Sequence, residues 1–276
     1  MKKVLAYTFL TVISLIMLYP LLWLLGASFK SNAEIYSSVW FVPHKLNLEV
    51  YRNAWKTNTG YSMGHYFMNT FAVILPKTLL ATLSSVLVAY GFARFDFPMK
   101  RLFFALLMGG MFMPAIVTVM PLYMMWSRLG LLDTYIPLVL PSAFATEGMF
   151  VFILIRFIDG VPREFDDAGR IDGCSSMGVL FYILLPCIRP AVITIAVFSF
   201  LWTMNDFLTP LIMISRPENY TLSLALRMSV DSTGQGYEEC KIIAMSVIGL
   251  IPSVTVFALA QDKLISGIST GGLSGQ

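Results

Sequence analysis

The residues best placed to do chemistry lie in one polar stretch, from Pro162 to Gly173, in a chain that is otherwise mostly apolar. Glu164, Asp166 and Asp167 put carboxylates near its start, where negative charge complements a helix dipole. Pro162 suits a first helical position because it lacks an amide hydrogen, and glycine commonly ends helices. The stretch therefore predicts a short acidic helix from Pro162 to Gly173.

Small and apolar side chains accompany these charges, which is unusual for a solvated loop. Phe165 and Ile171 are its apolar members. Its small residues would let another backbone approach closely; they are Ala168, Gly169 and Gly173. Asp166 and Arg170 stand four positions apart, so the sequence predicts an ion pair between them. On composition alone, a charged and solvated connector is the alternative.

The chain as a whole has the composition of an integral membrane protein. Its 276 residues are 57% hydrophobic and only 13% charged, whereas soluble domains carry about 25% charged residues. The net charge of +3 is too small and too dispersed to indicate a nucleic-acid partner. Cys174, Cys187 and Cys240 show no paired spacing and predict neither a disulfide framework nor a zinc site. His44 and His65 are too isolated to be metal ligands.

Six segments reach the length of about 20 mostly apolar residues that a membrane-crossing helix needs. They run from Val4 to Ala27, from Tyr66 to Ala93, from Leu102 to Ser127, from Asp133 to Arg156, from Ala191 to Ile214 and from Ile242 to Gln261. The first exceeds the apolar run of a secretory signal, so we expect it to remain as a helix. Several prolines are expected to kink or end these helices; they are Pro76, Pro114, Pro121 and Pro137.

Positive charges in the short loops predict the orientation. They crowd the N-terminus and the loop after the second span, whereas the next short loop holds a single arginine. The residues are Lys2, Lys3, Arg94, Lys100, Arg101 and, in the poorer loop, Arg128. Both termini and the polar helix are then expected in the cytoplasm, and residues 28–65 and 215–241 outside. The predicted fold class is all-α, integral to the cell (inner) membrane, with six transmembrane helices and a cytoplasmic helix between spans four and five.

The polar helix resembles the coupling motif of permease subunits in binding-protein-dependent ABC importers. That motif reads Glu-Ala-Ala, three residues, Gly, nine residues, Ile, one residue, Leu-Pro. Here Asp167-Ala168-Gly169 is followed at the same spacing by Gly173, Ile183 and Leu185-Pro186. The departures replace acid with acid and small with small. In this family the helix fits a cleft on the ATPase, which the resemblance implies for Glu164, Phe165, Asp166, Asp167, Ala168, Gly169, Asp172 and Gly173.

The resemblance extends to sugar-importer permeases of the carbohydrate uptake type, similar to the second permease of the maltose transporter. It rests on the stretches Tyr90 to Phe95, Pro121 to Tyr123, Leu129 to Tyr135, Trp202 to Phe207 and Gly267 to Gly272. The family implies a type I importer fold and a partner permease, two ATPase subunits that bind ATP and Mg²⁺, a solute-binding protein and no cofactor in this chain. It also divides the chain into an N-terminal helix and outer loop (1–65), a permease domain (66–262) and a cytoplasmic tail (263–276). The apolar segment from Cys174 to Leu185 is expected to brace the polar helix along the membrane face.

Polar residues inside the predicted spans are candidates for a substrate path, since such groups usually face a protein interior or water. They are Lys77, Tyr123, Glu147, Trp202, Asn205 and Asp206. The indole of Trp202 can stack on a sugar ring, and Asn205 and Asp206 can bind hydroxyl groups. The structural alternative is that Asp206 pairs with Lys77 or caps a neighbouring helix, and that Trp202 packs in the core. Lys77 would also suit a carboxylated sugar.

Two other classes of function fit the sequence less well. A secondary transporter or channel often carries several membrane acids, but only Glu147 and Asp206 qualify here and no inverted repeat is evident. A membrane enzyme would need a catalytic set, a metal cluster or a phosphate loop, and the sequence shows none of these. Without a G-x-x-x-x-G-K-[ST] loop, ATP hydrolysis is expected in a separate chain.

Overall fold

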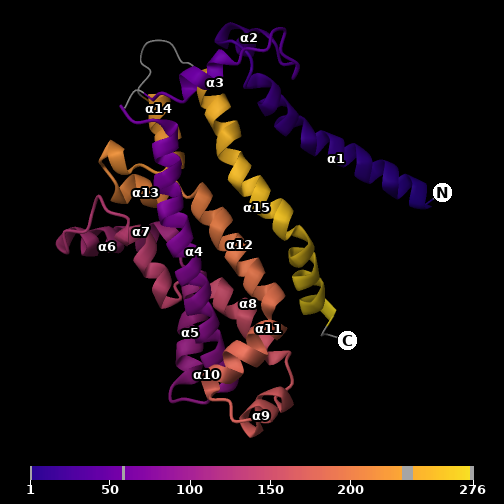
Figure 1. Ribbon diagram of the computed structural model, residues 1–276, viewed down its shortest axis with the longest axis vertical. Helices are drawn as coiled ribbons and strands as arrows, with labels where there is room; N and C mark the ends of the chain where they lie inside the picture. The colour runs from indigo at the N-terminus through magenta and orange to yellow at the C-terminus, as the bar shows by residue number, and fades with distance from the viewer. Residues whose placement is uncertain (1, 58–59, 232–238, 274–276) are drawn as a thin grey trace. The chain divides into compact units, whose positions relative to one another are not determined.

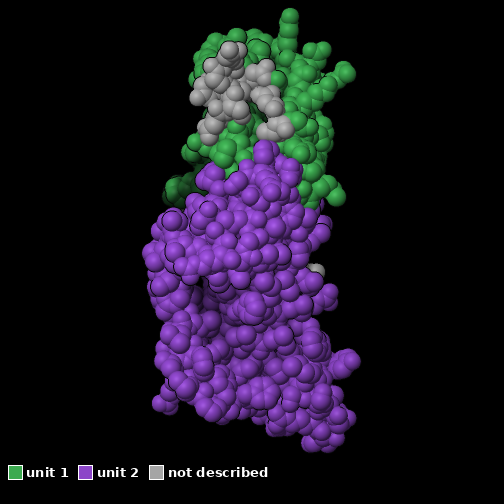
Figure 2. Space-filling model, turned by 90° about the vertical axis from the view of Figure 1, so that its left-hand side faces the viewer, with its two compact units in different colours: residues 1–69, 220–252 green, residues 70–219, 253–276 purple. Residues whose placement is uncertain are grey.

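The computed structural model describes residues 2–57, 60–231 and 239–273, and these residues form helices joined by turns (Figure 1). In this part of the chain, extended pairing is limited to an isolated bridge between Lys56 and Ser62. The chain divides into two compact units (Figure 2). Unit 1 comprises Met1–Asn69 and Tyr220–Pro252, and unit 2 comprises Thr70–Asn219 and Ser253–Gln276. Two long helices, α4 and α15, contribute to both.

Unit 1 holds the N-terminal span and the segments expected outside the membrane. Its helices are α1 (Lys2–Ala27), α2 (Asn32–Ser37), α3 (Glu49–Ala54), the start of α4 (Met63–Arg94), α14 (Leu222–Asp231) and the first part of α15 (Glu239–Leu273). Ser31 caps α2, because its hydroxyl accepts a hydrogen bond from the Glu34 amide. The apolar side chains of α1 are mostly exposed, as expected of a helix surrounded by lipid or by a partner protein.

Unit 2 begins with the rest of α4 and contains most of the remaining elements. They are α5 (Lys100–Met111), α6 (Ala115–Arg128), α7 (Ile136–Val139), the 3₁₀-helix η1 (Leu140–Phe144), α8 (Gly148–Asp159), α9 (Glu164–Ile171), α10 (Ser176–Gly178), the π-helix η2 (Val179–Leu184), α11 (Leu185–Cys187), α12 (Arg189–Asn205), α13 (Leu208–Met213) and the 3₁₀-helix η3 (Pro217–Asn219). The main core joins Ala89 of α4, Leu154 of α8, Leu180 of η2 and Ile195 of α12.

The membrane spans follow the sequence pattern, with two of them bent. Among the residues that the structure describes, four helices are long and apolar enough to cross a membrane: Lys3–Ala27, Met63–Arg94, Ile136–Asp159 and Glu239–Asp262. Two helix pairs pass the same test together but bend by 104° and 83°: Lys100–Met111 with Ile116–Arg128, and Ser176–Cys187 with Arg189–Asn205. Six spans result if each bent pair is one span, in agreement with the predicted fold class.

The third predicted span, Leu102 to Ser127, is not a continuous helix. It breaks between Met111 and Ala115, at Pro114. Proline lacks an amide hydrogen and disfavours helical backbone at the residue before it, so the expected effect of Pro114 is confirmed. Pro76 and Pro121, in contrast, lie within α4 and α6.

The fifth and sixth spans end elsewhere than predicted. Helix α12 stops at Asn205 rather than near Ile214, because Asp206 adopts extended backbone, and a separate short helix, α13, begins at Leu208. Helix α15 continues past Gln261 to Leu273. The predicted tail from residue 263 is therefore helical as far as Leu273, and its last three residues, 274–276, lie outside the described part of the chain.

Asp133 connects two turns of unit 2 through hydrogen bonds. Its carboxylate Oδ1 accepts hydrogen bonds from the amides of Ser215 and Arg216, at 2.5 and 3.0 Å. Its own amide donates to the Met213 carbonyl, and its carbonyl accepts from the Asn219 side chain. Asp133 also has a φ of +60°, a conformation that Asn and Asp tolerate better than other non-glycine residues.

Replacing Asp133 with alanine is expected to lower the free energy of unfolding by about 1–3 kcal/mol, because two amides lose their acceptor. Asp133→Asn is the matched control, since it keeps one acceptor oxygen and tolerates the positive φ, and it should lose clearly less. Thermal unfolding of the purified protein in detergent measures both. Equal losses in the two variants would show that the carboxylate bonds do not hold these turns.

Candidate functional site

The polar stretch forms helix α9, from Glu164 to Ile171, slightly shorter than the predicted span of Pro162 to Gly173. Pro162 precedes the cap residue Arg163, and Asp172 ends the helix. Gly173 has a φ of +86°, and the amide of Cys174 donates to the Gly169 carbonyl. This left-handed ending requires glycine, so the predicted role of Gly173 as the helix stop is confirmed.

Helix α9 has an inner and an outer face. Asp166 and Gly169 are buried against unit 2. The other residues expected to dock are exposed: Glu164, Phe165, Asp167, Ala168, Asp172 and Gly173. Half of the Phe165 surface and 86% of the Ile171 surface are accessible. The outer face thus combines carboxylates with two large apolar side chains, of which Phe165 is half exposed and Ile171 is almost fully exposed in the described chain.

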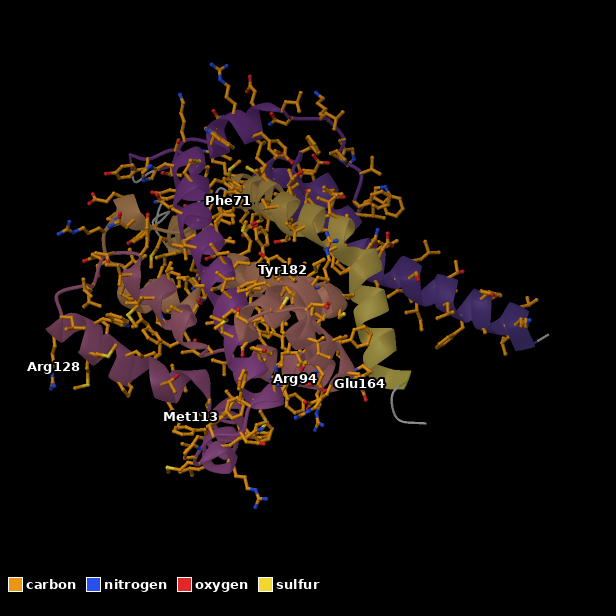
Figure 3. All side chains as sticks on the ribbon, turned by 60° about the horizontal axis from the view of Figure 1, so that its bottom comes forward. Phe71, Arg94, Met113, Arg128, Glu164 and Tyr182 are labelled. Carbon is orange, nitrogen blue, oxygen red and sulfur yellow. The ribbon has the colours of Figure 1, made fainter. Side chains whose placement is uncertain are left out.

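A buried ion pair holds the inner face to the end of α4. Nε of Arg94 lies 2.6 Å from Oδ2 of Asp166, and the two side chains are only 4% and 8% exposed. Nη2 of Arg94 also donates to the Val161 carbonyl at 2.7 Å. The predicted pair between Asp166 and Arg170 is wrong, because Asp166 turns inward while Arg170 stays exposed. Arg94 and Glu164, the first residue of α9, are labelled in Figure 3.

The two halves of the sequence motif meet at Gly169. A Cβ atom on Gly169 would lie 2.3 Å from Cδ1 of Ile183 and 3.4 Å from Cγ2 of Val179. Ile183 belongs to the π-helix η2, whose wider turn sits directly behind α9. The motif spacing therefore has a packing basis, because it brings Ile183 against the small residue of α9. The group that approaches Gly169 is a side chain of this chain's own η2 rather than another backbone, so the expected backbone approach is not what the structure shows here.

A larger side chain at Gly169 is expected to displace α9. Gly169→Val should destabilise the protein by about 1–3 kcal/mol, the usual range for overpacking. Ile183→Ala in the same chain should recover part of the loss, because it removes the clashing atoms. Ala168→Val, on the exposed face, is the control and should change the unfolding temperature little. If the Ile183→Ala double variant were no more stable than Gly169→Val, the packing explanation would be incorrect.

The segment behind α9 is also bonded to α4. The hydroxyl of Tyr90 donates to the Ser176 carbonyl at 2.9 Å, and Ser175 caps α10 through the Gly178 amide. The chain then bends by 83° into α12. This arrangement agrees with the expected brace from Cys174 to Leu185. Arg94 and Tyr90 together attach both α9 and its brace to the last turns of α4.

The candidate substrate-path residues gather only in part. Trp202 of α12 stacks on Phe150 of α8, with ring centroids 5.2 Å apart, and 47% of Trp202 is exposed. Phe150 lies in the first turn of α8, and Glu147 is the residue directly before this helix, with no side-chain capping hydrogen bond. The stack thus brings the N-terminus of α8 near the end of α12. Asn205 is exposed, and its side-chain amide nitrogen donates a hydrogen bond to the Leu201 carbonyl.

Asp206 acts as a helix cap. Its Oδ1 accepts a hydrogen bond from the Thr209 amide at the start of α13. The ion pairs of the described residues do not include one between Asp206 and Lys77. Of the two structural options for Asp206, the structure supports the hydrogen bond to a neighbouring helix rather than the pairing with Lys77. Tyr123 lies half-buried on α6, within a different element from the others.

Lys77 and a row of hydroxyl groups lie on α4. Lys77 and Glu147 are half-buried, and neither enters an ion pair within the described residues. Three hydroxyl oxygens on one face of α4 are buried without a partner in the described chain: those of Thr78, Thr82 and Ser85. Sequence reasoning missed these hydroxyls, although their i, i+4, i+7 spacing could have indicated a shared face. Groups of three or more metal-binding side chains are absent from the described residues.

Together, the apolar membrane-length helices and the polar helix α9 that is anchored to α4 define a helical membrane protein. Residues 81–269 match the family model of the binding-protein-dependent transport system inner membrane component. The chain belongs to this family, and the resemblance drawn from its coupling motif is confirmed.

Individual relatives agree with this assignment. The chain is 30% identical to the diacetylchitobiose uptake system permease protein NgcG of Streptomyces coelicolor, over 94% of this chain and 84% of that protein. It is 30% identical to the arabinooligosaccharides transport system permease protein AraQ of Bacillus subtilis, over 97% and 94%. Its fold matches a crystal structure of a bacterial ABC transporter involved in the import of the acidic polysaccharide alginate. That match has a TM-score of 0.77 at 19% identity and covers 95% and 96% of the two chains.

Proposed function

We propose that this chain is one of two homologous permease subunits of an ATP-driven importer that takes up a sugar or oligosaccharide. A binding protein outside the membrane delivers the sugar, and the permease pair releases it into the cytoplasm by alternating access. The observation that carries the proposal is the outer face of α9, whose acidic and apolar side chains are presented by a helix fixed to α4. The names of the relatives NgcG and AraQ support an oligosaccharide as cargo.

In this proposal the energy comes from two separate ATPase subunits, which hold ATP and Mg²⁺. Phe165 and Ile171 fill a cleft on one ATPase, and Glu164, Asp167 and Asp172 meet its basic or polar groups. The N-terminus, α9 and the C-terminus lie in the cytoplasm, as the positive charges around α4 and α5 favour. Movement of the ATPase then reaches the membrane through Arg94 and the brace.

The sugar path in this proposal runs past the end of α12 and the middle of α4. The exposed part of Trp202 offers a ring face for stacking, and the unpaired hydroxyls of Thr78, Thr82 and Ser85 can bond to sugar hydroxyls or water once the spans separate. Lys77 adds a cation that suits a carboxylated sugar. A thermal-shift screen of the binding protein against oligosaccharides would identify the cognate sugar, because that sugar should raise the unfolding temperature of the binding protein.

Reconstitution into liposomes tests the proposal. The chain, its partner permease, the ATPase and the binding protein are combined, and ATP hydrolysis and sugar uptake are measured together. Hydrolysis should rise several-fold when the liganded binding protein is added, and uptake should require ATP. ATP-independent uptake driven by a proton or sodium gradient would instead support the secondary-transporter alternative and overturn the proposal.

A further inference from the structure

Residues 38–42 of unit 1 form an irregular segment with an unusually apolar surface. Val39 is 78% exposed, Trp40 63% and Val42 49%. The segment follows α2, ends before Pro43, and contains no charged side chain. An exposed apolar run of this kind in a membrane protein marks contact with lipid or with another protein. The contacts between this segment and α1 bear on which of the two it meets.

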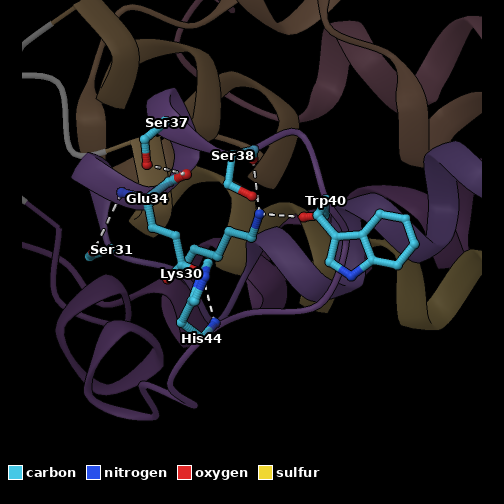
Figure 4. A network of polar contacts seen from close by, with 7 residues as sticks. All are labelled: Lys30, Ser31, Glu34, Ser37, Ser38, Trp40 and His44. Atoms are coloured by element: carbon cyan, nitrogen blue, oxygen red, sulfur yellow. Dashed lines mark hydrogen bonds and ion pairs between the residues drawn. The ribbon is translucent and has the colours of Figure 1, made fainter.

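The backbone of this segment is bonded to side chains of α1 and the turn after it. Nζ of Lys30 donates to the carbonyls of Ser38 and Trp40, at 3.0 and 2.5 Å (Figure 4). The Tyr19 hydroxyl donates to the carbonyl between them, that of Val39, at 3.1 Å. Three successive carbonyl oxygens are thus satisfied by side chains. Backbone oxygens near hydrocarbon need such partners, because water is scarce there.

The same contacts place the segment beside the last turns of the span. A Cβ atom on Gly26 would lie 1.6 Å from the Phe41 carbonyl oxygen, so the two backbones touch where only glycine fits. Tyr19 lies about two turns before the end of α1, at 3.6 residues per turn. Because α1 is long and apolar enough to cross the membrane, residues 38–42 run back along its membrane-facing end.

Two further features fix the segment in this position. Lys30 is completely buried, so its ammonium group serves the carbonyls rather than solvent. Glu34 of α2 accepts a hydrogen bond from the His44 amide and pairs with the His44 ring, both at 2.7 Å. These contacts with His44 hold the pKa of the Glu34 carboxyl below its usual value. The pair closes the base of the loop, and Val39, Trp40 and Val42 project from it.

We propose that residues 38–42 are a membrane-interface anchor, which inserts its apolar side chains among the lipid headgroups of the leaflet at the C-terminal end of α1. The occupant of this surface is lipid, because the surface continues the exposed apolar side of the span. The depth is the interface rather than the hydrocarbon core. Within the described chain, the amides of Val39, Trp40 and Phe41 have no protein acceptor and need water, and tryptophan favours this depth.

Nitroxide accessibility tests the anchor in the full chain. Cys174, Cys187 and Cys240 are replaced by serine, single cysteines at position 39 or 42 are spin-labelled, and the protein is placed in phosphatidylcholine nanodiscs. The ratio of oxygen to nickel-chelate accessibility should be several-fold higher at these positions than at the exposed Lys45, and lower than at the exposed Leu15 near the middle of α1. Ratios equal to that at Lys45 mean an aqueous surface and overturn the proposal. Low accessibility to both reagents means that protein covers the segment, which also overturns it.

A second variant tests the carbonyl clamp. Lys30→Met keeps the length and apolar stem of the side chain but removes the donor. The labels at positions 39 and 42 should then shift toward the ratio found at Lys45, because freed carbonyls seek water. The label at Leu15, near the middle of α1, should keep its value, which shows that α1 still spans the membrane. Unchanged ratios at 39 and 42 would show that Lys30 does not hold the segment in the interface.

Discussion

Replacing Asp166 with alanine is expected to lower the free energy of unfolding by about 3–5 kcal/mol, the cost of removing one partner of a buried ion pair. The variant leaves the Arg94 guanidinium buried without its carboxylate, in a site where both side chains are nearly inaccessible. Because the pair joins α9 to α4, the loss should appear first as release of α9. The unfolding temperature in detergent and the proteolysis rate at Arg163 and Arg170 measure the two effects.

Three variants isolate the cause. Arg94→Ala should cost as much as Asp166→Ala, since it strands the carboxylate. The double variant Arg94→Met/Asp166→Leu should regain most of the stability, because an apolar pair of similar volume avoids the desolvation of two charges. Asp167→Ala, the exposed neighbour, should stay within about 0.5 kcal/mol of the parent, as surface substitutions usually do. A loss at Asp167 as large as that at Asp166 would contradict the ion-pair explanation.

The ion pair between Arg94 and Asp166 connects α9 directly to α4. The exposed residues of α9 enter no ion pair of this kind in the described part of the chain. Arg94 ends α4, a helix that crosses the membrane, and Tyr90 one turn earlier holds the brace. A force applied to the outer face of α9 is therefore transmitted to α4 through contacts at fixed distances. Under the proposed function, variants of Arg94 that keep the fold should lower sugar uptake more than ATP hydrolysis.

Local features of this chain were predictable because their causes are local. Gly173 ends α9 through its positive φ, and Pro114 breaks the third span because it lacks an amide hydrogen. The approximate positions of six apolar segments follow from hydropathy, if each bent helix pair of the described chain is counted as one span. The partner of Asp166 was not predictable, because i, i+4 spacing favours Arg170 and only the folded chain brings Arg94 near. Arg94 entered the sequence argument merely as one positive charge on the expected cytoplasmic side.

The candidate substrate-path residues were likewise predictable only in part. Hydropathy picks out Lys77, Glu147 and Asp206 as charges inside apolar segments, and it cannot say that Asp206 ends α12 and caps α13. That end depends on the extended backbone at Asp206, which the apolar run through Ile214 conceals. Lys77 and Glu147 have no ion-pair partner in the described chain, and polar groups at this depth need one or need water. A partner permease or an aqueous cavity supplies it under the proposed function.

Replacing Ile171 with arginine is expected to reduce ATP-driven sugar uptake by about tenfold or more, without lowering the stability of the isolated chain. Ile171 is almost fully exposed, so its substitution breaks no contact within unit 2. Burying a new charge in an apolar cleft of an ATPase would cost far more than the roughly 1.4 kcal/mol that corresponds to tenfold in affinity. The dissociation constant of the ATPase and the uptake rate in liposomes measure the effect.

The matched comparisons separate docking from folding. Phe165→Ala truncates the second exposed apolar side chain and should weaken ATPase binding in the same direction, by about 1–2 kcal/mol if it is an interface anchor. Leu129→Arg introduces the same charge at an exposed apolar residue of the turn after α6, on the side expected to face outward, and should leave ATPase binding unchanged. Intact ATPase binding in Ile171→Arg would contradict docking through the exposed face of α9, because a charge at this position would not fit an apolar cleft.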